Sequence, residues 1–218
     1  MLKTRLRYSK TGKAKYVSHL DLMTLMRRAF LRSGFRLKYS EGFNPHPYIS
    51  VALPLPVGCG SVCELMDIGL ADDERQEEIA GRVNAMLPEG FAVREAYRSG
   101  RKFSDIAWIE IRGVFNYSDG APQSAAERLT ELFSGGNIII KKKTKRGFTE
   151  FDAAPHIKDT IFSGGSDITM TAKISAQNPT INTADILSIL DTGDSFLKPD
   201  HSSFTRMEIF DENIKIFR

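Results

Sequence analysis

The first hundred residues change twice between the hydrophobic spacing of a β-strand and that of an α-helix. Residues 2–8 alternate apolar and polar side chains, and apolar residues then recur every three or four positions over residues 18–33. Further strand patterns occupy residues 35–39, 49–57, 64–70 and 91–97, and a second helical pattern occupies residues 73–86. Strand, helix, strand, strand, helix, strand is the order of a ferredoxin-like unit, and this half of the sequence fits that order.

A similar order begins again after a polar, basic segment at residues 98–104, which contains Gly100 and suits a linker. The later patterns are strands at residues 107–117, 137–143, 167–176 and within 205–217, and helices at residues 121–133 and 183–190. Residues 144–166 form a long segment without a regular pattern. We therefore expect an α+β protein made of two ferredoxin-like (βαββαβ) units in tandem, at residues 1–99 and 105–218, the second with a basic hairpin.

The composition is that of an ordinary globular protein, with 41% hydrophobic and 26% charged residues. No apolar run approaches the roughly 18 residues that cross a bilayer, and residues 1–7 alternate charged and apolar side chains instead of forming a secretory signal. We therefore expect a cytoplasmic protein. Cys59 and Cys63 are the two cysteines, which are too few for a disulfide scaffold or an iron–sulfur cluster.

Charge is unevenly distributed along the chain, although the net charge is only +3. Residues 1–50 are rich in lysine and arginine and contain only Asp21 and Glu41 as acids, whereas residues 72–78 are strongly acidic. A second basic run occupies residues 141–146. Clustered cations of this kind are typical of proteins that bind a polyanion such as RNA, although a solvated basic face without a ligand has the same pattern.

A histidine lies at the predicted start of the first helix. Ser18 followed by Asp21 is a capping pattern, in which the serine oxygen accepts the Asp21 amide and the carboxylate returns to the Ser18 amide. His19 then falls in the first helical turn, where the helix dipole disfavours a charged imidazole. We expect a neutral His19 that accepts a proton.

A second histidine, His46, lies between Pro45 and Pro47 in a stiff, extended segment that follows Gly42. If residues 35–39 form a strand parallel to residues 2–8, this segment returns toward the start of the first helix. His46 would then lie near His19 and Asp21, at the edge of the sheet where open sheets usually keep their sites.

Three segments in the first sixty residues carry a resemblance to a known family: residues 15–22 (KYVSHLDL), 39–47 (YSEGFNPHP) and 52–58 (ALPLPVG). They resemble the radical-SAM-associated bacterial family that carries a domain of unknown function, as do residues 145–148 with Asp152 and Pro155. In that family the domain is fused to, or encoded beside, a radical-SAM protein, often near genes for ribosomal proteins and an RNase E/G-type ribonuclease. The resemblance implies an RNA- or ribosome-linked role beside a separate radical-SAM partner.

The chain does not itself carry the radical-SAM signature C-x3-C-x2-C, because Met66 stands where the third cysteine would be. It is therefore expected to be the accessory protein, which binds RNA and requires no cofactor of its own. The expected RNA-binding residues are Arg27, Arg28, Arg32, Tyr39, Phe43, Asn44, Lys141, Lys142, Lys143, Lys145 and Arg146. Cations would contact phosphates, and the aromatic side chains would either stack on unpaired bases or belong to the core.

Two other functions fit the same residues. The first is a metal-independent endoribonuclease, in which His19 or His46 is the general base and a lysine or arginine stabilises the phosphorane. The second is a small metal-binding or protein-interaction module, with His19, Asp21 and His46 as metal ligands. Residues two apart on a regular helix point in different directions, so that Asp21 is better explained as the helix cap.

Overall fold

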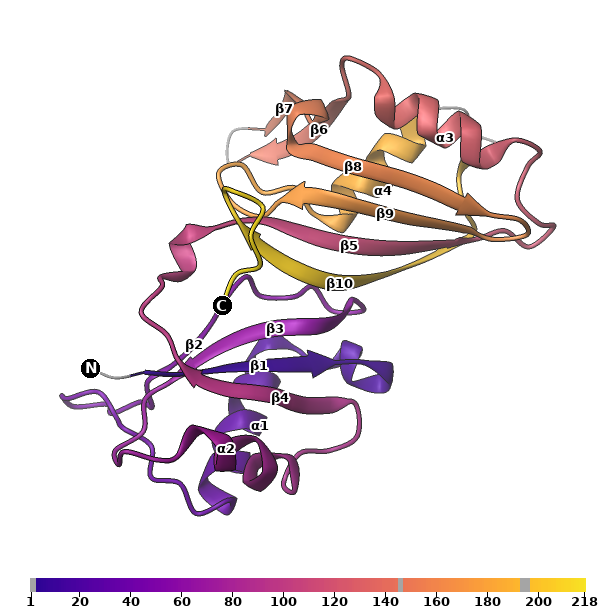
Figure 1. Ribbon diagram of the computed structural model, residues 1–218. Helices are drawn as coiled ribbons and strands as arrows, with labels where there is room; N and C mark the ends of the chain where they lie inside the picture. The colour runs from indigo at the N-terminus through magenta and orange to yellow at the C-terminus, as the bar shows by residue number, and fades with distance from the viewer. Residues whose placement is uncertain (1–2, 145–146, 193–196) are drawn as a thin grey trace. The chain divides into compact units, whose positions relative to one another are not determined.

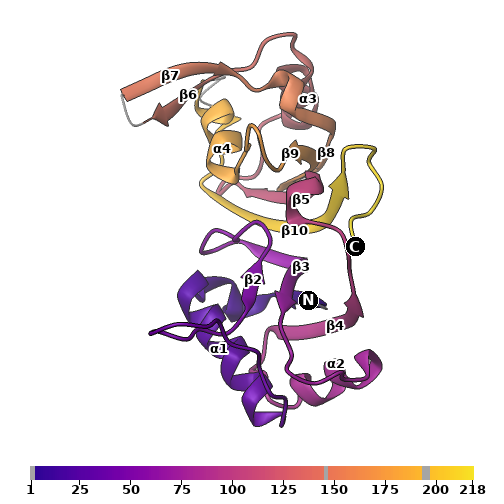
Figure 2. The same ribbon diagram turned by 90° about the vertical axis from the view of Figure 1, so that its left-hand side faces the viewer.

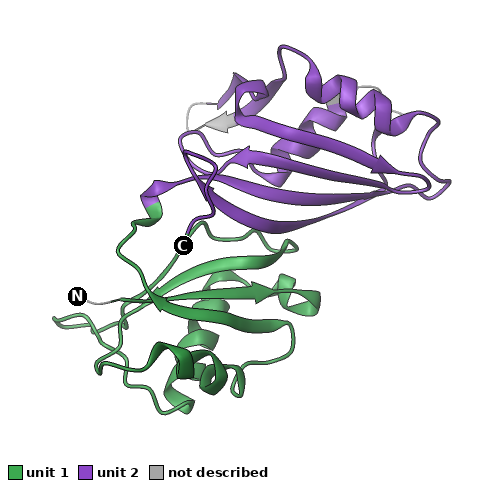
Figure 3. Ribbon diagram, viewed as in Figure 1, with its two compact units in different colours: residues 1–103, 218 green, residues 104–217 purple. Residues whose placement is uncertain are grey.

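The computed structural model describes residues 3–144, 147–192 and 197–218. The chain divides into two compact units, unit 1 (residues 1–103 with Arg218) and unit 2 (residues 104–217) (Figure 3). The division falls between Phe103 and Ser104, within the segment that the sequence suggests as a linker. Both units combine helices with antiparallel strands, which confirms the α+β class.

Unit 1 is an antiparallel sheet with two α-helices. Its elements are β1 (Thr4–Lys10), the short 3-10 helix η1 (Gly12–Tyr16), α1 (His19–Arg32), β2 (Ile49–Val51), β3 (Gly60–Ile68), α2 (Gln76–Asn84) and β4 (Phe91–Arg98) (Figure 1). The strand order is β4-β1-β3-β2, and every neighbouring pair is antiparallel. Two strands, β2 and β3, thus lie between α1 and α2 in the sequence of unit 1.

The core of unit 1 lies between the sheet and the helices. Leu6 of β1 and Met66 of β3 project from the sheet into this core, and Met26 and Phe30 of α1 meet them. Ile79 adds the buried side of α2. These are the apolar positions of the helical and alternating patterns, so burial of one face of each element explains the sequence periodicity.

The start of α1 follows from its capping residues. The Ser18 Oγ accepts the Asp21 amide at 3.2 Å, and the Ser18 hydroxyl donates to the Asp21 carboxylate at 2.7 Å. The predicted N-cap is thus confirmed, except that the carboxylate accepts the hydroxyl rather than the Ser18 amide. Gly34, with φ of +79°, ends the helix in the left-handed conformation that glycine adopts without strain.

The predicted strand at residues 35–39 is wrong. These residues make only the isolated bridges from Leu37 to Leu70 and from Tyr39 to Pro47, and the second strand is β2. β2 is also shorter than the predicted strand at residues 49–57, because Pro54 and Pro56 lack the amide donors that would extend the ladder.

Unit 2 combines four antiparallel strands with two α-helices and a separate hairpin. Its elements are β5 (Ile106–Asn116), α3 (Ala125–Ser134), β6 (Ile139–Thr144), β7 (Gly147–Asp152), η3 (Ala154–His156), β8 (Ile157–Gly164), β9 (Ile168–Ser175), α4 (Thr183–Thr192) and β10 (His201–Asp211), with η2 (Phe103–Asp105) at the boundary. The neighbouring strands are β10-β5-β9-β8, all antiparallel. Among the strands that the structure describes, β6 and β7 pair only with each other.

This arrangement corrects the expected role of residues 137–143. They form one strand of the β6–β7 hairpin, and the strand beside β9 is β8, from the segment that has no regular sequence pattern. Among the helices that the structure describes, none has the length and hydrophobicity needed to cross a membrane.

Candidate nucleic-acid interface

The β6–β7 hairpin extends away from the sheet of unit 2 (Figure 2) and has one inward and one outward face. Successive side chains of a strand point to opposite faces, and Lys141 lies directly opposite Glu150. Phe148, two residues from Glu150, therefore shares the outward face with Lys141 and Ile139. Lys141 is exposed and Phe148 is 74% exposed, whereas Ile140 on the inward face is only 1% exposed.

The inward face holds the hairpin against unit 2. The Lys142 ammonium donates to the Thr180 carbonyl oxygen, lies 3.4 Å from the Asp185 carboxylate and sits over the Phe151 ring. Phe151 also stacks on His156, with 5.3 Å between ring centroids. Lys142, which the sequence suggests as an RNA contact, is therefore engaged in fixing the hairpin.

Asp152 closes the base of the hairpin. Its Oδ1 accepts the amides of Ile138 and Ala154, each at 3.0 Å. These two backbone hydrogen bonds lower the pKa of the Asp152 carboxyl below its ordinary value, because they stabilise the charged form. Of the other predicted contacts in this run, Lys145, Arg146 and the side chain of Lys143 lie outside the described part of the chain.

The arginines of α1 lie on its outer side. The helix buries Leu22, Met26, Ala29 and Phe30, whereas Arg27, Arg28 and Arg32 are exposed. Arg32 donates to the Met86 carbonyl oxygen at 2.9 Å. Arg27 has no ion pair with any residue that the structure describes, so its charge is available to a ligand.

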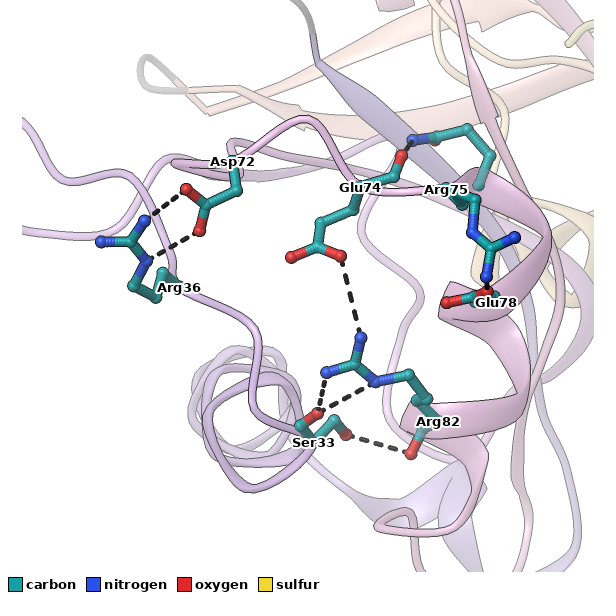
Figure 4. Close-up of polar contacts among 8 residues, drawn as sticks. Ser33, Arg36, Asp72, Glu74, Arg75, Glu78 and Arg82 are labelled. Atoms are coloured by element: carbon teal, nitrogen blue, oxygen red, sulfur yellow. Dashed lines mark hydrogen bonds and ion pairs between the residues drawn. The ribbon is translucent and has the colours of Figure 1, made fainter.

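The acidic segment that follows β3 neutralises other cations of unit 1 (Figure 4). Arg36 pairs with Asp72, and Arg75 pairs with Glu78. Arg82 lies 3.7 Å from the Glu74 carboxylate and donates to the Ser33 carbonyl oxygen at 2.7 Å. The charge asymmetry of the sequence is therefore partly cancelled in the folded unit, which leaves the outer side of α1 as a basic surface.

The loop before β2 is held closed by Ser40 and His46. The Ser40 amide donates to the His46 carbonyl oxygen at 2.9 Å, and the His46 amide donates to the Ser40 Oγ at 3.1 Å. At the tip of the loop Phe43 is fully exposed and Asn44 is exposed, and Tyr39 at its base is partly exposed. The predicted Tyr39, Phe43 and Asn44 thus lie in one ordered loop, and Phe43 does not belong to the core.

His46 itself is oriented by this loop. Its Nδ1 lies 3.0 Å from the Ser40 Oγ and 3.4 Å from the Asn44 carbonyl oxygen. Because a carbonyl oxygen only accepts, this geometry favours the tautomer with the proton on Nδ1 and the lone pair on Nε2. His46 can therefore act as a hydrogen-bond acceptor or as a base through Nε2.

His19 belongs to a different surface. It is the first residue of α1 and is exposed, and the pocket that contains His46 does not include it. Within the described ranges, no three His, Cys, Asp or Glu side chains are close enough to hold a metal ion. The hypothesis of a site formed by His19, Asp21 and His46 is therefore not supported.

The sequence pattern does not identify the outward aromatic side chain Phe148. The sequence shows only the lysines of this run as a cluster, since the register that puts Phe148 on the same face as Lys141 depends on where the hairpin turns. The alternation of Phe148, Glu150 and Asp152 with small or apolar residues is the signal that would have placed them on one face.

A family model described as "Uncharacterized protein conserved in bacteria (DUF2344)" matches residues 3–183, most of the chain. The chain belongs to the DUF2344 family. This assignment confirms the expected bacterial domain of unknown function. No curated protein matches the DUF2344 chain.

Two solved structures show how far the fold of this DUF2344 protein is shared. A chain in the crystal structure of a Cbf5-Nop10-Gar1 complex has 9% identity and a TM-score of 0.52, over 96% of this chain and 50% of that chain. This chain thus spans about half the length of that relative, and the likeness concerns the fold alone. An unknown protein from Galdieria sulphuraria has 9% identity and a TM-score of 0.27, over 94% of this chain and 96% of that chain.

Proposed function

We propose that this DUF2344 protein binds RNA through two surfaces, the outward face of the β6–β7 hairpin and the basic outer side of α1. The observation that carries the proposal is that an exposed cation, Lys141, and an exposed aromatic ring, Phe148, lie on the same face of a projecting hairpin. Cations attract the phosphate backbone, and an aromatic ring offers a platform on which an unpaired base stacks.

Unit 1 also has exposed cations and an exposed aromatic ring. Arg27, Arg28 and Arg32 offer cationic groups along α1, and Phe43 offers an exposed ring at the tip of a closed loop. The exposed Phe43 ring is an apolar surface that a ligand can cover. Unstacked bases of a single-stranded nucleic acid pack on such rings, so a strand of this kind fits the loop. Asn44, beside Phe43, has the amide donor and acceptor that read a base edge.

The architecture supports a comparable role for both units. The strand order β4-β1-β3-β2 of unit 1 and the order β10-β5-β9-β8 of unit 2 correspond to each other if the β6–β7 hairpin is treated as an insertion between α3 and β8. We infer two ferredoxin-like units in tandem, the second with an inserted hairpin. An inserted element outside the sheet buries one face against the unit and leaves its other face exposed, where binding residues are commonly found.

The reaction partner is proposed to be a separate radical-SAM protein. Cys59 and Cys63 are both buried, and Met66 occupies the position of the third cluster ligand. The chain would thus present RNA, or a ribosome-linked substrate, to a catalyst that it does not itself contain. Co-purification of a radical-SAM protein with the tagged chain from bacterial cells tests this association directly.

The RNA proposal is tested by fluorescence anisotropy with a labelled, unstructured oligoribonucleotide in EDTA. We expect Lys141→Ala and Phe148→Ala each to weaken binding about tenfold, since one phosphate contact or one stacked base is lost. Lys198→Ala and Ile161→Ala are the matched controls, because these side chains are also exposed on unit 2 but lie outside the hairpin. Equal effects of the hairpin variants and the controls would contradict the proposal.

A second candidate function, a metal-independent endoribonuclease, is favoured by the orientation of His46. With the proton on Nδ1, the Nε2 lone pair is available to accept a proton from a ribose 2′-hydroxyl. Formation of a cyclic-phosphate product in EDTA, lost in His46→Ala but retained in His19→Ala, is the result that would support it. Intact RNA after prolonged incubation would leave binding as the function.

A further inference from the structure

A small pocket in unit 1 has a neutral floor. Ser50 of β2 lies directly opposite Asp67 of β3, and Asp67 lies directly opposite Arg5 of β1. The Arg5 guanidinium donates to both Asp67 oxygens, at 2.7 and 3.0 Å, and also to the Arg101 carbonyl oxygen at 2.8 Å. Arg5 is 1% exposed and Asp67 is 9% exposed. The Asp67 charge is therefore compensated and does not repel an anion.

The rim of this pocket carries polar groups that make no hydrogen bond or ion pair with the described residues. Lys3, His46, Tyr48 and Ser50 line it, and its volume is about 110 Å³. The Lys3 ammonium and the hydroxyls of Tyr48 and Ser50 have no partner among the residues that the structure describes, whereas His46 is held through its Nδ1. Three hydrogen-bond donors, one of them cationic, thus surround a space that holds several water molecules.

These groups match a phosphate monoester. A terminal phosphate offers three non-bridging oxygens and more than one negative charge, which suit one ammonium and two hydroxyl donors. An internal phosphodiester carries one charge and only two non-bridging oxygens, so it matches these three donors less well than a terminal phosphate does.

We propose that this pocket binds the terminal phosphate of an RNA strand, with Lys3, Tyr48 and Ser50 as the phosphate contacts. The inference rests on the proposed RNA binding for the identity of the strand, and it adds a site that reads the end of the strand. The hairpin and α1 hold RNA regardless of its ends, whereas the pocket distinguishes a phosphorylated end from a hydroxyl end.

The test compares one internally labelled oligoribonucleotide in three forms, with a 5′-phosphate, with a 3′-phosphate, or with hydroxyl groups at both ends. In EDTA, anisotropy should show that one phosphorylated form binds about tenfold more tightly than the hydroxyl form. Lys3→Ala and Ser50→Ala should bring this ratio close to one. Lys13→Ala is the matched control, because Lys13 is an exposed lysine of unit 1 that does not line the pocket.

The two proposals fail in different ways. Lys141→Ala should weaken all three forms equally and leave the ratio unchanged, so that a loss of RNA binding is separated from a loss of end recognition. Equal binding of the three forms to the wild-type protein, or a ratio unchanged by Lys3→Ala, would overturn the phosphate site. If the pocket binds adenosine 5′-monophosphate but does not distinguish the RNA ends, it is a site for free nucleotides. If the RNA is shortened during the assay, the pocket belongs to a cleavage site. Either result overturns the proposal.

Discussion

Arg5 and Asp67 form an ion pair that is largely withdrawn from solvent within unit 1. Replacing one partner of such a pair leaves the other charge buried and uncompensated, which typically costs about 3–5 kcal/mol. We therefore expect Asp67→Asn to lower the free energy of unfolding by an amount of this order, measured by urea denaturation. The Phe103 ring, 4.4 Å from the Arg5 guanidinium, does not replace a carboxylate.

The control for this prediction is the pair between Arg98 and Asp73 in the same unit. The Asp73 side chain is 87% exposed, so water screens the interaction and already solvates the carboxylate. Asp73→Asn should therefore change the free energy of unfolding by roughly 0–1 kcal/mol. Similar losses in the two variants would show that the Arg5–Asp67 pair behaves as a surface pair.

Asp152 gives unit 2 a specific sensitivity to acid. Its pKa is lowered in the folded state, so its contribution to stability is present above the ordinary aspartate pKa of about 4 and is lost as the pH falls below that value. Asp152→Asn should flatten the acid limb of the melting temperature against pH. Asp119→Asn, which replaces an exposed aspartate of the same unit, should leave that limb unchanged.

At the residue scale, the sequence predicts interactions between near neighbours best. The Ser18–Asp21 cap is local and was predictable from the spacing of two residues. The Arg5–Asp67 pair joins residues 62 positions apart, and nothing in the sequence indicates which acid meets Arg5. The expected approach of His46 to His19 depended on a strand at residues 35–39 that does not form.

The β6–β7 hairpin is the element on which the RNA proposal chiefly depends. Since neither strand pairs with the rest of the sheet, we expect the sheet of unit 2 to survive replacement of residues 141–150 by an Asn-Gly turn. The near-ultraviolet circular dichroism should be retained, whereas RNA binding by anisotropy should fall at least to the level of the Lys141→Ala variant. A variant that fails to fold would instead make the hairpin a structural part of unit 2.

At the element scale, the helices were easier to predict than the strands around the hairpin. The sequence pattern does not predict β8, because a bulge between Lys158 and Ile161 breaks the alternation of its side chains. Within β8 only Ile157 and Phe162 are buried, five positions apart, which matches neither a strand nor a helix period. The alternation of side chains predicts β6 as a strand. It does not predict which strand pairs with β6, so the separate hairpin is not visible in the sequence.

For the whole molecule, the arrangement of charge should decide RNA binding more than the net charge of +3. For single strands, the logarithm of the binding constant falls with the logarithm of the salt concentration by about 0.7 per phosphate contact. Lys141→Ala and Arg27→Ala should each reduce this slope by about 0.7, and the double variant by about 1.4. Lys198→Ala is the control, because it also removes one positive charge but lies outside the proposed surfaces. An equal decrease of the salt slope in this variant would show that net charge, and not the position of the cation, decides RNA binding.

The sequence indicated two successive sets of helices and strands but not how their charges are paired. The acidic residues at positions 72–78 read as a separate block in the sequence, and in the fold they compensate Arg36, Arg75 and Arg82. Tertiary contacts decide which cations remain available to a ligand. The sequence therefore predicts that a basic surface exists, but not which residues form it. Arg27 and Lys141 stand out only once these contacts are known.

The strand orders also have a consequence for biosynthesis. β1 and β5 open their units in the sequence, yet each lies between two neighbours in its sheet, and one of those neighbours is the last strand of the unit, β4 or β10. A nascent chain therefore carries β1 with an open edge until Arg98 has left the ribosome, and it carries β5 in the same state until β10 follows. The strands of unit 1 can therefore pair with one another while unit 2 is still being translated.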